Sequence, residues 1–252
     1  MNAQRFTDRS IVVTGGASGI GQATAIAFAR EGGRVTIADL DEARGAAVVE
    51  EIRAAGGIAQ FVRTDATDED QVAALIAQAG VAHGPVRHAF NNVGLSRHGS
   101  IETMTRADWD WTIGISLTSS WLAMKYEVPV MLANGGGTIV NTASMSAKIY
   151  TAAASPAYSA AKAGVVQLSH YASAAYAARG IRVNSVSPGL TATPVVADML
   201  SEEEQRAIAG ELQAIARAVD PSEIAATVLF LSSDEAAMIT GRDIEVSGGR
   251  RV

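Results

Sequence analysis

Short apolar runs that alternate with longer helical segments are the feature that most constrains the fold of this 252-residue chain. The runs are rich in β-branched residues, as in SIVVTG, and a segment with helical spacing follows, as in GIGQATAIAFAREGG. Continuous apolar strands that alternate with helices predict a parallel sheet covered on both faces. Strands are expected at residues 10–15, 34–40, 58–65, 86–94, 137–144, 181–189 and 243–249.

No linker rich in proline or serine and no shift in composition divides the chain. We therefore predict one α/β domain over residues 1–252, built on a doubly wound parallel sheet. Residues 191–220 break the alternation, because they are long, partly helical in pattern, and follow a strand end. Ligands of open α/β sheets bind beyond the strand ends, so we expect this segment to form a lid over a substrate.

Composition narrows the choice of partners. The formal net charge is −6, and an acidic surface repels phosphate backbones, which argues against a nucleic-acid partner. The chain has no cysteine, and its four histidines show no ligand spacing, so no metal site is predicted. No run is long enough to cross a bilayer, and the polar start MNAQRFTDRS lacks a signal-peptide core. We expect a cytoplasmic protein without a membrane partner.

The stretch VVTGGASGIGQA lies where the first strand meets the first helix. Gly15, Gly19 and Gly21 lack side chains, so the backbone can approach a pyrophosphate, and the helix N-terminus supplies N–H groups and positive dipole. A plain strand-to-helix turn is the alternative, but this context is the one that a dinucleotide motif requires. The sequence predicts a Rossmann-like dinucleotide site that includes Ser18 and Ile20.

Asp39 ends the second strand, about 20 residues beyond the glycines, where a carboxylate accepts hydrogen bonds from the adenosine ribose. This carboxylate would repel a 2′-phosphate, and no lysine or arginine nearby offsets it. We therefore expect NAD rather than NADP, with Leu40 beside the adenosine. The alternative is that Asp39 caps the next helix, although Asp41 is better placed for that role.

With these motifs the chain resembles the short-chain dehydrogenase/reductase family over nearly its whole length. The similar elements, in the family's order, are the turn TGGASGIG, NNVG at residues 91–94, YSAAK, SPG and the C-terminal ITGRDIEVSGG. The resemblance implies further contacts to adenine, ribose and nicotinamide. The residues that it assigns to them are Asp65 and Ala66, then Asn92, then Pro188, Gly189, Thr191 and Thr193. The alternative for Asp65 and Asn92 is that they are turn residues at strand ends.

Tyr158 and Lys162 stand four positions apart, so both side chains leave the same face of a helix. A free tyrosine titrates near pH 10, but a neighbouring ammonium group favours the phenolate and lowers that pKa. We expect Tyr158 to accept the proton of an alcohol while hydride leaves the carbon, and to donate it in reverse. Lys162 would also bind the nicotinamide ribose. The alternative is an interface tyrosine beside a solvated lysine.

Two serines receive roles from the resemblance. Ser144 would hold the substrate oxygen, with Ser146 as a rival because the spacing to Tyr158 differs from the family's commonest one. Ser116 stands where the family has an asparagine that holds a water between the lysine and solvent. A hydroxyl offers one donor where an amide offers two, so the expected relay through Ser116 is altered.

An apolar substrate pocket is expected from side chains on the loops and on the start of the lid, although these could instead pack on the core. They are Leu95, Met145, Tyr150, Leu190, Val195, Val196 and Met199. Arg97 and His98 could meet a polar or acidic substrate group or be solvated. The resemblance also implies a homotetramer, which fits the many small residues of the helix that contains Tyr158.

The expected function is therefore an NAD-dependent alcohol dehydrogenase or carbonyl reductase that interconverts a secondary alcohol and a ketone. Two alternatives remain open. One is an NADPH-dependent ketoacyl reductase, and the other is a dinucleotide-sensing protein without turnover.

Overall fold

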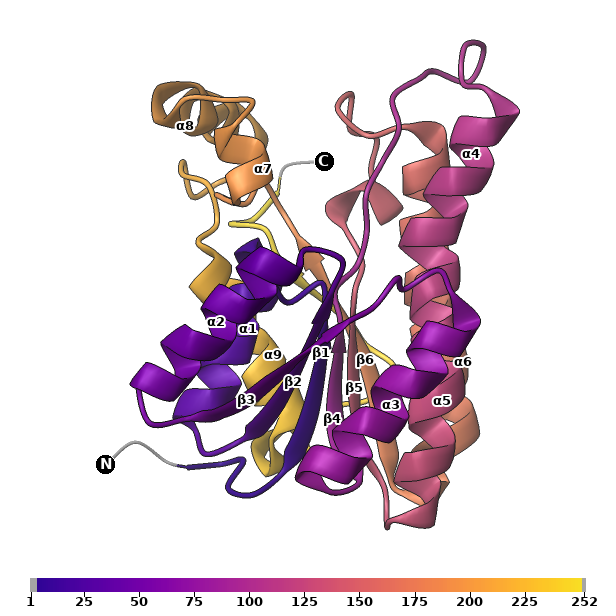
Figure 1. Ribbon diagram of the computed structural model, residues 1–252. Helices are drawn as coiled ribbons and strands as arrows, with labels where there is room; N and C mark the ends of the chain where they lie inside the picture. Colours follow the sequence, from indigo (N-terminus) through magenta and orange to yellow (C-terminus); the bar gives the residue numbers. More distant parts are fainter. Residues whose placement is uncertain (1–3, 251–252) are drawn as a thin grey trace.

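A seven-stranded parallel sheet forms the centre of the computed structural model, which describes residues 4–250 (Figure 1). The strands are β1 (Ser10–Thr14), β2 (Arg34–Asp39), β3 (Ile58–Arg63), β4 (Val86–Asn91), β5 (Gly137–Thr142), β6 (Ile181–Pro188) and β7 (Asp243–Val246). Their order in the sheet is β3-β2-β1-β4-β5-β6-β7, and every neighbouring pair is parallel. The predicted doubly wound α/β fold is confirmed.

Helices cover both faces of the sheet, as Figure 1 shows. The helices of the described residues are α1 (Gly19–Arg30), α2 (Glu42–Ala54), α3 (Glu69–His83), α4 (Arg106–Ile113), α5 (Ser119–Ala133), α6 (Pro156–Tyr176), α7 (Pro194–Ala197), α8 (Glu202–Leu212) and α9 (Pro221–Ser232). Side chains of α1, α2 and α9 form one buried cluster with the sheet, and those of α3, α5 and α6 form the other. Alternate residues of a strand join opposite clusters: Ile11 and Val13 join the first, and Val12 joins the second.

The strand order reverses between β1 and β4, and this switch point sets the position of a ligand crevice. The strand ends are level there. Thr14 pairs with Ala38 on one side and with Asn91 on the other, and Asn91 pairs with Asn141. The residues that directly follow this row therefore lie at the same edge of the sheet.

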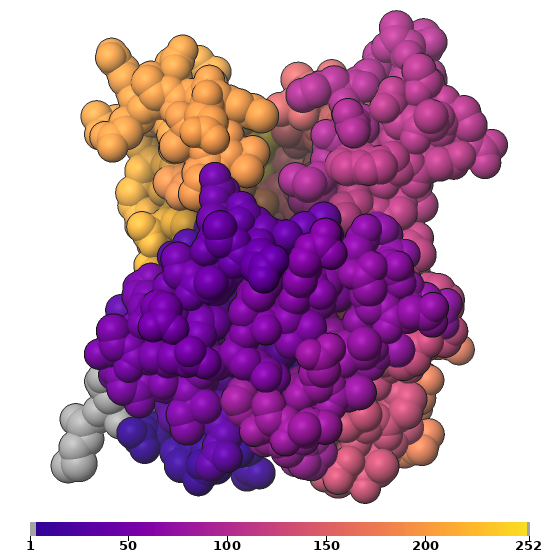
Figure 2. Space-filling model, viewed as in Figure 1, coloured from indigo at the N-terminus to yellow at the C-terminus, as the bar shows by residue number. Residues whose placement is uncertain are grey.

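The segment 191–220 stands above that edge, with α7 and α8 in it. Backbone bonds fix its base: Ala192 N donates to Val219 O (2.9 Å), Val219 N donates to Leu190 O (2.7 Å), and Ile215 N donates to Gly248 O (2.9 Å). In Figure 2 a hollow separates this segment, in orange, from the magenta segment that leads into α4. Its action as a lid remains a prediction.

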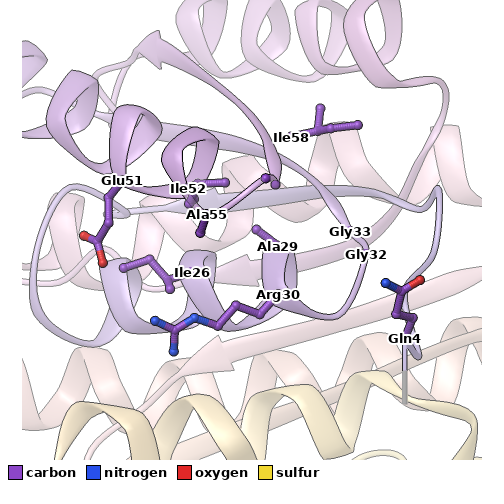
Figure 3. Close-up of a pocket in the computed structure, with 12 residues that line it drawn as sticks. Gln4, Ile26, Ala29, Arg30, Gly32, Gly33, Glu51, Ile52, Ala55 and Ile58 are labelled. Carbon is purple, nitrogen blue, oxygen red and sulfur yellow. The ribbon is translucent and has the colours of Figure 1, made fainter. Parts of the chain in front are cut away.

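A second, smaller hollow of about 280 Å³ lies at the opposite end of the sheet (Figure 3). The ends of α1 and α2 form it, with Ile26, Arg30, Glu51 and Ile52 among its lining residues. None of the predicted site residues lines it. No helix within residues 4–250 is long and apolar enough to span a membrane.

His88 in β4 is half-buried between the sheet and the N-terminal segment. Its Nδ1 lies 2.7 Å from Thr138 Oγ1, and its ring packs edge-on against Phe6 at 5.1 Å between centroids. Burial, with a smaller contribution from nearby arginines, lowers the pKa of His88 to about 3. The unfolded chain, with an ordinary histidine pKa near 6.5, therefore binds the proton more readily than the folded one.

We predict that His88 makes the protein less stable as the pH falls through 6.5 toward 3, because protons then favour the unfolded chain. Between pH 7 and pH 5 the free energy of unfolding should fall by about 2 kcal/mol more in the wild type than in His88→Asn. Urea unfolding of both proteins across this range measures the difference. Other titrating groups cancel in the comparison, and parallel pH profiles would contradict the prediction.

Candidate active site

Most of the predicted site residues line one pocket of about 470 Å³ at the carboxyl ends of the strands. It lies at the edge where the order of the sheet reverses. The predicted residues on its wall are Gly15, Ser18, Gly19, Ile20, Asp39, Leu40, Ala66, Asn92, Leu95, Ser144, Tyr158, Lys162, Pro188, Gly189, Leu190, Thr191, Thr193, Val195 and Val196.

The glycine-rich turn requires its glycines for two different reasons. Gly15 and Gly19 have φ angles of 64° and 53°, in the left-handed region that disfavours other residues. Gly21 is needed for space, because a Cβ there would lie 2.0 Å from Gly15 O. Ser18 occupies the N-cap of α1, and its side chain makes no hydrogen bond to the first helical turn. The residues therefore fit a pyrophosphate, which would meet backbone N–H groups and the helix N-terminus.

Asp39 is bonded to the glycine-rich turn while it lines the pocket. Its Oδ2 accepts from Ala17 N (3.1 Å), and its Oδ1 accepts from Asp41 N (3.1 Å). Asp41 is the residue that caps α2, by accepting from Arg44 N (3.0 Å). Among the described residues that line the pocket, Lys162 is the one basic side chain. The carboxylate therefore faces the pocket without a cation that would suit a 2′-phosphate.

Asn92 joins three strand ends. Its backbone N donates to Thr14 Oγ1 (3.2 Å), and its Nδ2 donates to Gly15 O (3.3 Å). Its Oδ1 accepts from Thr142 Oγ1 (3.1 Å). The amide thus links β4 to the glycine-rich turn and to β5, and it fixes the floor of the pocket.

Lys162 is 1% exposed, and its Nζ donates to Thr142 O at 2.6 Å. Burial lowers the pKa of Lys162 to about 7, so the amine is only partly charged at neutral pH. The backbone of Gly94 passes so close that a Cβ there would lie 2.6 Å from Nζ.

Tyr158 lies one turn before Lys162 on α6, and its ring centroid is 5.6 Å from Lys162 Nζ. Burial raises the pKa of Tyr158, and a hydrogen bond with Ser144 opposes this effect. The lowered pKa that the sequence predicts is therefore not found in the protein alone. The physical reason is that Lys162 is itself desolvated, and burial disfavours the phenolate more than the neighbouring groups favour it.

Ser144 and Ser146 lie on either side of the pocket wall. Ser144 follows β5 and lines the pocket, whereas Ser146 is buried behind it, at 7% exposure. Ser146 Oγ donates to Ser144 Oγ at 2.9 Å. The hydroxyl that faces the pocket is that of Ser144.

Ser116 is fully buried in a π-helical turn, Gly114–Thr118, between α4 and α5. Its Oγ donates to Leu95 O (2.7 Å) and accepts from Leu95 N (3.0 Å). The side chain therefore holds the loop that contains Leu95, and its proton is already used. Toward a relay water it could only accept a hydrogen bond, so the relay remains a prediction.

Other predicted residues lie away from the pocket wall. Gly21 packs under the glycine-rich turn, and Met145 is buried. Asp65 Oδ1 accepts from the N (2.8 Å) and Oγ1 (2.7 Å) of Thr67, so its carboxylate closes a turn instead of facing the pocket. Tyr150 is 88% exposed and Met199 is 67% exposed, because the loops that contain them turn outward.

Several lining residues were not predicted. They are Thr64, Val93, Gly94, Ile115, Thr142, Ala143 and Pro194. Each of them lies within two residues of a strand end or of a predicted site residue, so proximity to a motif was the signal that could have identified them. Within residues 4–250 no group of three or more His, Asp or Glu side chains could hold a metal ion.

Comparison with known proteins begins with a family model described as enoyl-(acyl carrier protein) reductase, which matches residues 15–251. The chain is 41% identical to cis-4-hydroxycyclohexanecarboxylate dehydrogenase of Sinomonas cyclohexanicum, over 98% of each chain. It is 37% identical to cyclohexanol dehydrogenase of Acinetobacter sp. strain SE19, over 98% of this chain and 96% of the relative. It is 32% identical to a 3-oxoacyl-(acyl-carrier-protein) reductase of Thermotoga maritima, over 97% of this chain and 98% of the relative.

Two solved structures are also similar to this chain over nearly its whole length. A putative short-chain dehydrogenase/reductase from Burkholderia xenovorans has a TM-score of 0.91 and 38% identity, over 97% of this chain and 96% of that one. A 3-oxoacyl-(acyl-carrier protein) reductase with bound NAD from Brucella melitensis has a TM-score of 0.89 and 30% identity, over 98% of this chain and 93% of that one.

We predict that Gly21→Ala prevents nicotinamide dinucleotide binding, because its Cβ would push the glycine-rich turn away from the start of α1. The dissociation constant for NADH, measured by fluorescence titration, should rise by about 100-fold or more, equivalent to about 3 kcal/mol. The matched control is Gly80→Ala in α3, where a Cβ meets nothing within 4 Å.

The control should bind NADH normally and gain about 1 kcal/mol of stability, as alanine does over glycine within a helix. Normal NADH affinity in Gly21→Ala would show that the turn does not hold the dinucleotide.

Proposed function

Because the chain belongs to the short-chain dehydrogenase/reductase family, we propose that it is an NAD(H)-dependent oxidoreductase that interconverts a secondary alcohol and a ketone. The observation that carries the proposal is the placement of Tyr158, Lys162 and Ser144 on one wall of a pocket that also contains the glycine-rich turn. A dinucleotide on that turn would place its reactive end toward the tyrosine.

In this proposal Tyr158 is the general acid/base. In oxidation its phenolate oxygen takes the proton of the alcohol while the C–H bond breaks, and in reduction the phenol returns the proton to the carbonyl oxygen. When bound, the nicotinamide supplies the acceptor or donor of the hydride. Ser144 donates a hydrogen bond to the reacting oxygen, and Lys162 holds the ribose and adds positive charge. Burial raises the pKa of Tyr158 and so disfavours its phenolate. The positive charge of the oxidised cofactor would oppose this effect and favour the phenolate that oxidation needs.

Asp39 supports NAD as the cofactor. The carboxylate lies on the pocket wall beside Leu40, and no basic side chain of the wall is available to pair with a 2′-phosphate there. The similar structure from Brucella melitensis is described with bound NAD.

The substrate that we propose is an alicyclic secondary alcohol. The pocket beside Ser144 and Tyr158 has an apolar wall formed by Leu95, Leu190 and Val195. Two relatives at 37% and 41% identity are dehydrogenases named for cyclohexane rings that bear a hydroxyl group. A compact ring fits such a wall better than an extended molecule.

A 3-oxoacyl thioester reductase is the second candidate, since the Thermotoga maritima relative has that name and the family model has a related description. Asp39 disfavours the NADPH-dependent form of this activity. A dinucleotide-sensing protein without turnover would not need Tyr158, Lys162 and Ser144 together on one wall.

Self-association into a homotetramer is part of the proposal. Trp121 on α5 and Tyr171 on α6 are 45% and 67% exposed, and contact with another copy through these helices would cover them.

We predict that Tyr158→Phe lowers kcat by about 10²- to 10⁴-fold, because it removes the proton acceptor and keeps the ring. The assay follows reduced nicotinamide by absorbance, with cyclohexanol, cis-4-hydroxycyclohexanecarboxylate and a short secondary alcohol as substrates. A 3-oxoacyl thioester with NADH or NADPH tests the second candidate. NADH affinity should stay at the wild-type value, and turnover by Tyr158→Phe at the wild-type rate would exclude the proposed mechanism.

Asp39→Asn should shift the cofactor preference toward NADP. The amide still accepts from Ala17 N but no longer repels a 2′-phosphate, so the ratio of kcat/KM for NAD to that for NADP should fall by about tenfold or more. The control is Asp41→Asn, which retains a helix cap and lies off the pocket wall. Equal ratios in all three proteins would contradict the role of Asp39.

A further inference from the structure

We propose that Ser146 is a positioning residue that commits Ser144 to donate its proton toward the reacting oxygen. The proposal rests on the proposed function, in which Tyr158 exchanges a proton with that oxygen. It assigns a specific task to a buried hydroxyl that does not line the pocket.

The geometry starts from the short 3₁₀ turn Met145–Ala147, which follows β5. Ser144 is its N-cap, and Ser144 Oγ accepts from Ser146 N at 3.2 Å. The side chain of Ser146 adds a second bond to the same atom, since Ser146 Oγ donates to Ser144 Oγ at 2.9 Å.

A hydroxyl oxygen has two acceptor sites and one proton. Ser146 fills both acceptor sites of Ser144, so the proton of Ser144 is what remains for a further hydrogen bond. Ser144 lies on the pocket wall with Tyr158, and it opposes the rise that burial causes in the pKa of the phenol. Its proton is therefore directed at the side of the pocket where the alcohol or carbonyl oxygen must lie.

The reaction needs a donor at this place. Negative charge develops on the substrate oxygen as the proton leaves, and a fixed donor that is already oriented stabilises that charge without reorganisation. A bond accepted from Ser146 also polarises the hydroxyl of Ser144, which strengthens the bond that Ser144 donates. Before a substrate binds, the same proton is available to Tyr158, where it favours the phenolate form.

The hydroxyl of Ser146 can be separated from the cap. The cap bond comes from the backbone N–H, which Ser146→Ala retains, whereas the second bond comes from the side chain alone. Ser146→Ala therefore frees one acceptor site on Ser144 and leaves the turn in place. The proton of Ser144 then loses its fixed direction.

The experiment is a double-mutant cycle on the full-length protein with NAD and the best substrate of the panel above. In the otherwise wild-type protein, Ser146→Ala should lower kcat by about tenfold. This loss is smaller than the one expected when an oxyanion donor is itself removed. In a Ser144→Ala background it should have no further effect, because its action passes through Ser144. NADH affinity and thermal midpoint should match those of the parent proteins.

A pH profile provides the readout that a purely structural role would not move. In Ser146→Ala the phenolate of Tyr158 is less stabilised, so the midpoint of kcat/KM for oxidation should move to higher pH by about half a unit, the scale of a weakened hydrogen bond. Ser146→Thr keeps the hydroxyl and should retain the wild-type midpoint.

Three outcomes would overturn the assignment: an unchanged kcat and pH profile in Ser146→Ala, an equal loss in the presence and absence of Ser144, or a Thr variant with a normal thermal midpoint and the alanine profile. These remain distinct from failure of the proposed function. If Tyr158→Phe turns over normally, the acid/base role itself is wrong. If Tyr158→Phe is inactive and Ser146→Ala is normal, only the role of Ser146 is lost.

Discussion

The hydrogen bond from Lys162 Nζ to Thr142 O is the interaction on which the rest of the site depends. Burial of an amine costs free energy unless the amine forms a hydrogen bond. Lys162 is almost wholly buried, and its hydrogen bond to Thr142 requires that α6 stays against the end of β5. Gly94 leaves the space that this contact needs. With Lys162 held, Tyr158 one turn earlier on the same helix face is held beside Ser144. The distance between the tyrosine and the glycine-rich turn then follows from the sheet.

A buried polar network behind the site holds the same elements together. Asn91 Nδ2 donates to Asn141 Oδ1 (3.0 Å) and to Glu127 Oε2 (3.1 Å), and Asn141 Nδ2 donates to Ser169 Oγ (2.9 Å). Burial raises the pKa of Glu127 to about 7, so part of the population is neutral at physiological pH and the cost of enclosing this carboxyl falls. These bonds join β4, β5, α5 and α6, and they form in only one register of strand and helix. The network therefore sets the register that the bond of Lys162 requires.

Register also explains why so much of the fold and the candidate site could be predicted from the sequence. The glycine-rich turn, NNVG and SPG lie at the carboxyl ends of strands, and the level strand ends bring them to one edge, whereas YSAAK lies on α6. Loop paths are a different matter. Asp65 also follows a strand, but its carboxylate is used by Thr67 in a turn. Tyr150 and Met199 were expected at the pocket for their apolar character, which does not distinguish a pocket wall from an exposed loop. The strand ends expected at residues 94 and 144 were too late, because the motifs there continue beyond the paired backbone.

The hydrogen bonds of serine hydroxyl groups are the second feature that could not be predicted from the sequence. A serine can donate one proton and accept two, and its neighbours decide which bonds it makes. Ser116 gives its proton to Leu95 O, and Ser146 gives its proton to Ser144. Each of these protons is used inside the protein, where it holds a loop or another hydroxyl. Ser144, which accepts twice from Ser146, is left with a proton for the pocket. The sequence alone could not rank Ser144 above Ser146 on chemical grounds, because both are serines near one strand end. The folded backbone distinguishes them. It turns the hydroxyl of Ser144 toward the pocket, and it places the hydroxyl of Ser146 where its hydrogen bond sets the direction of the Ser144 proton.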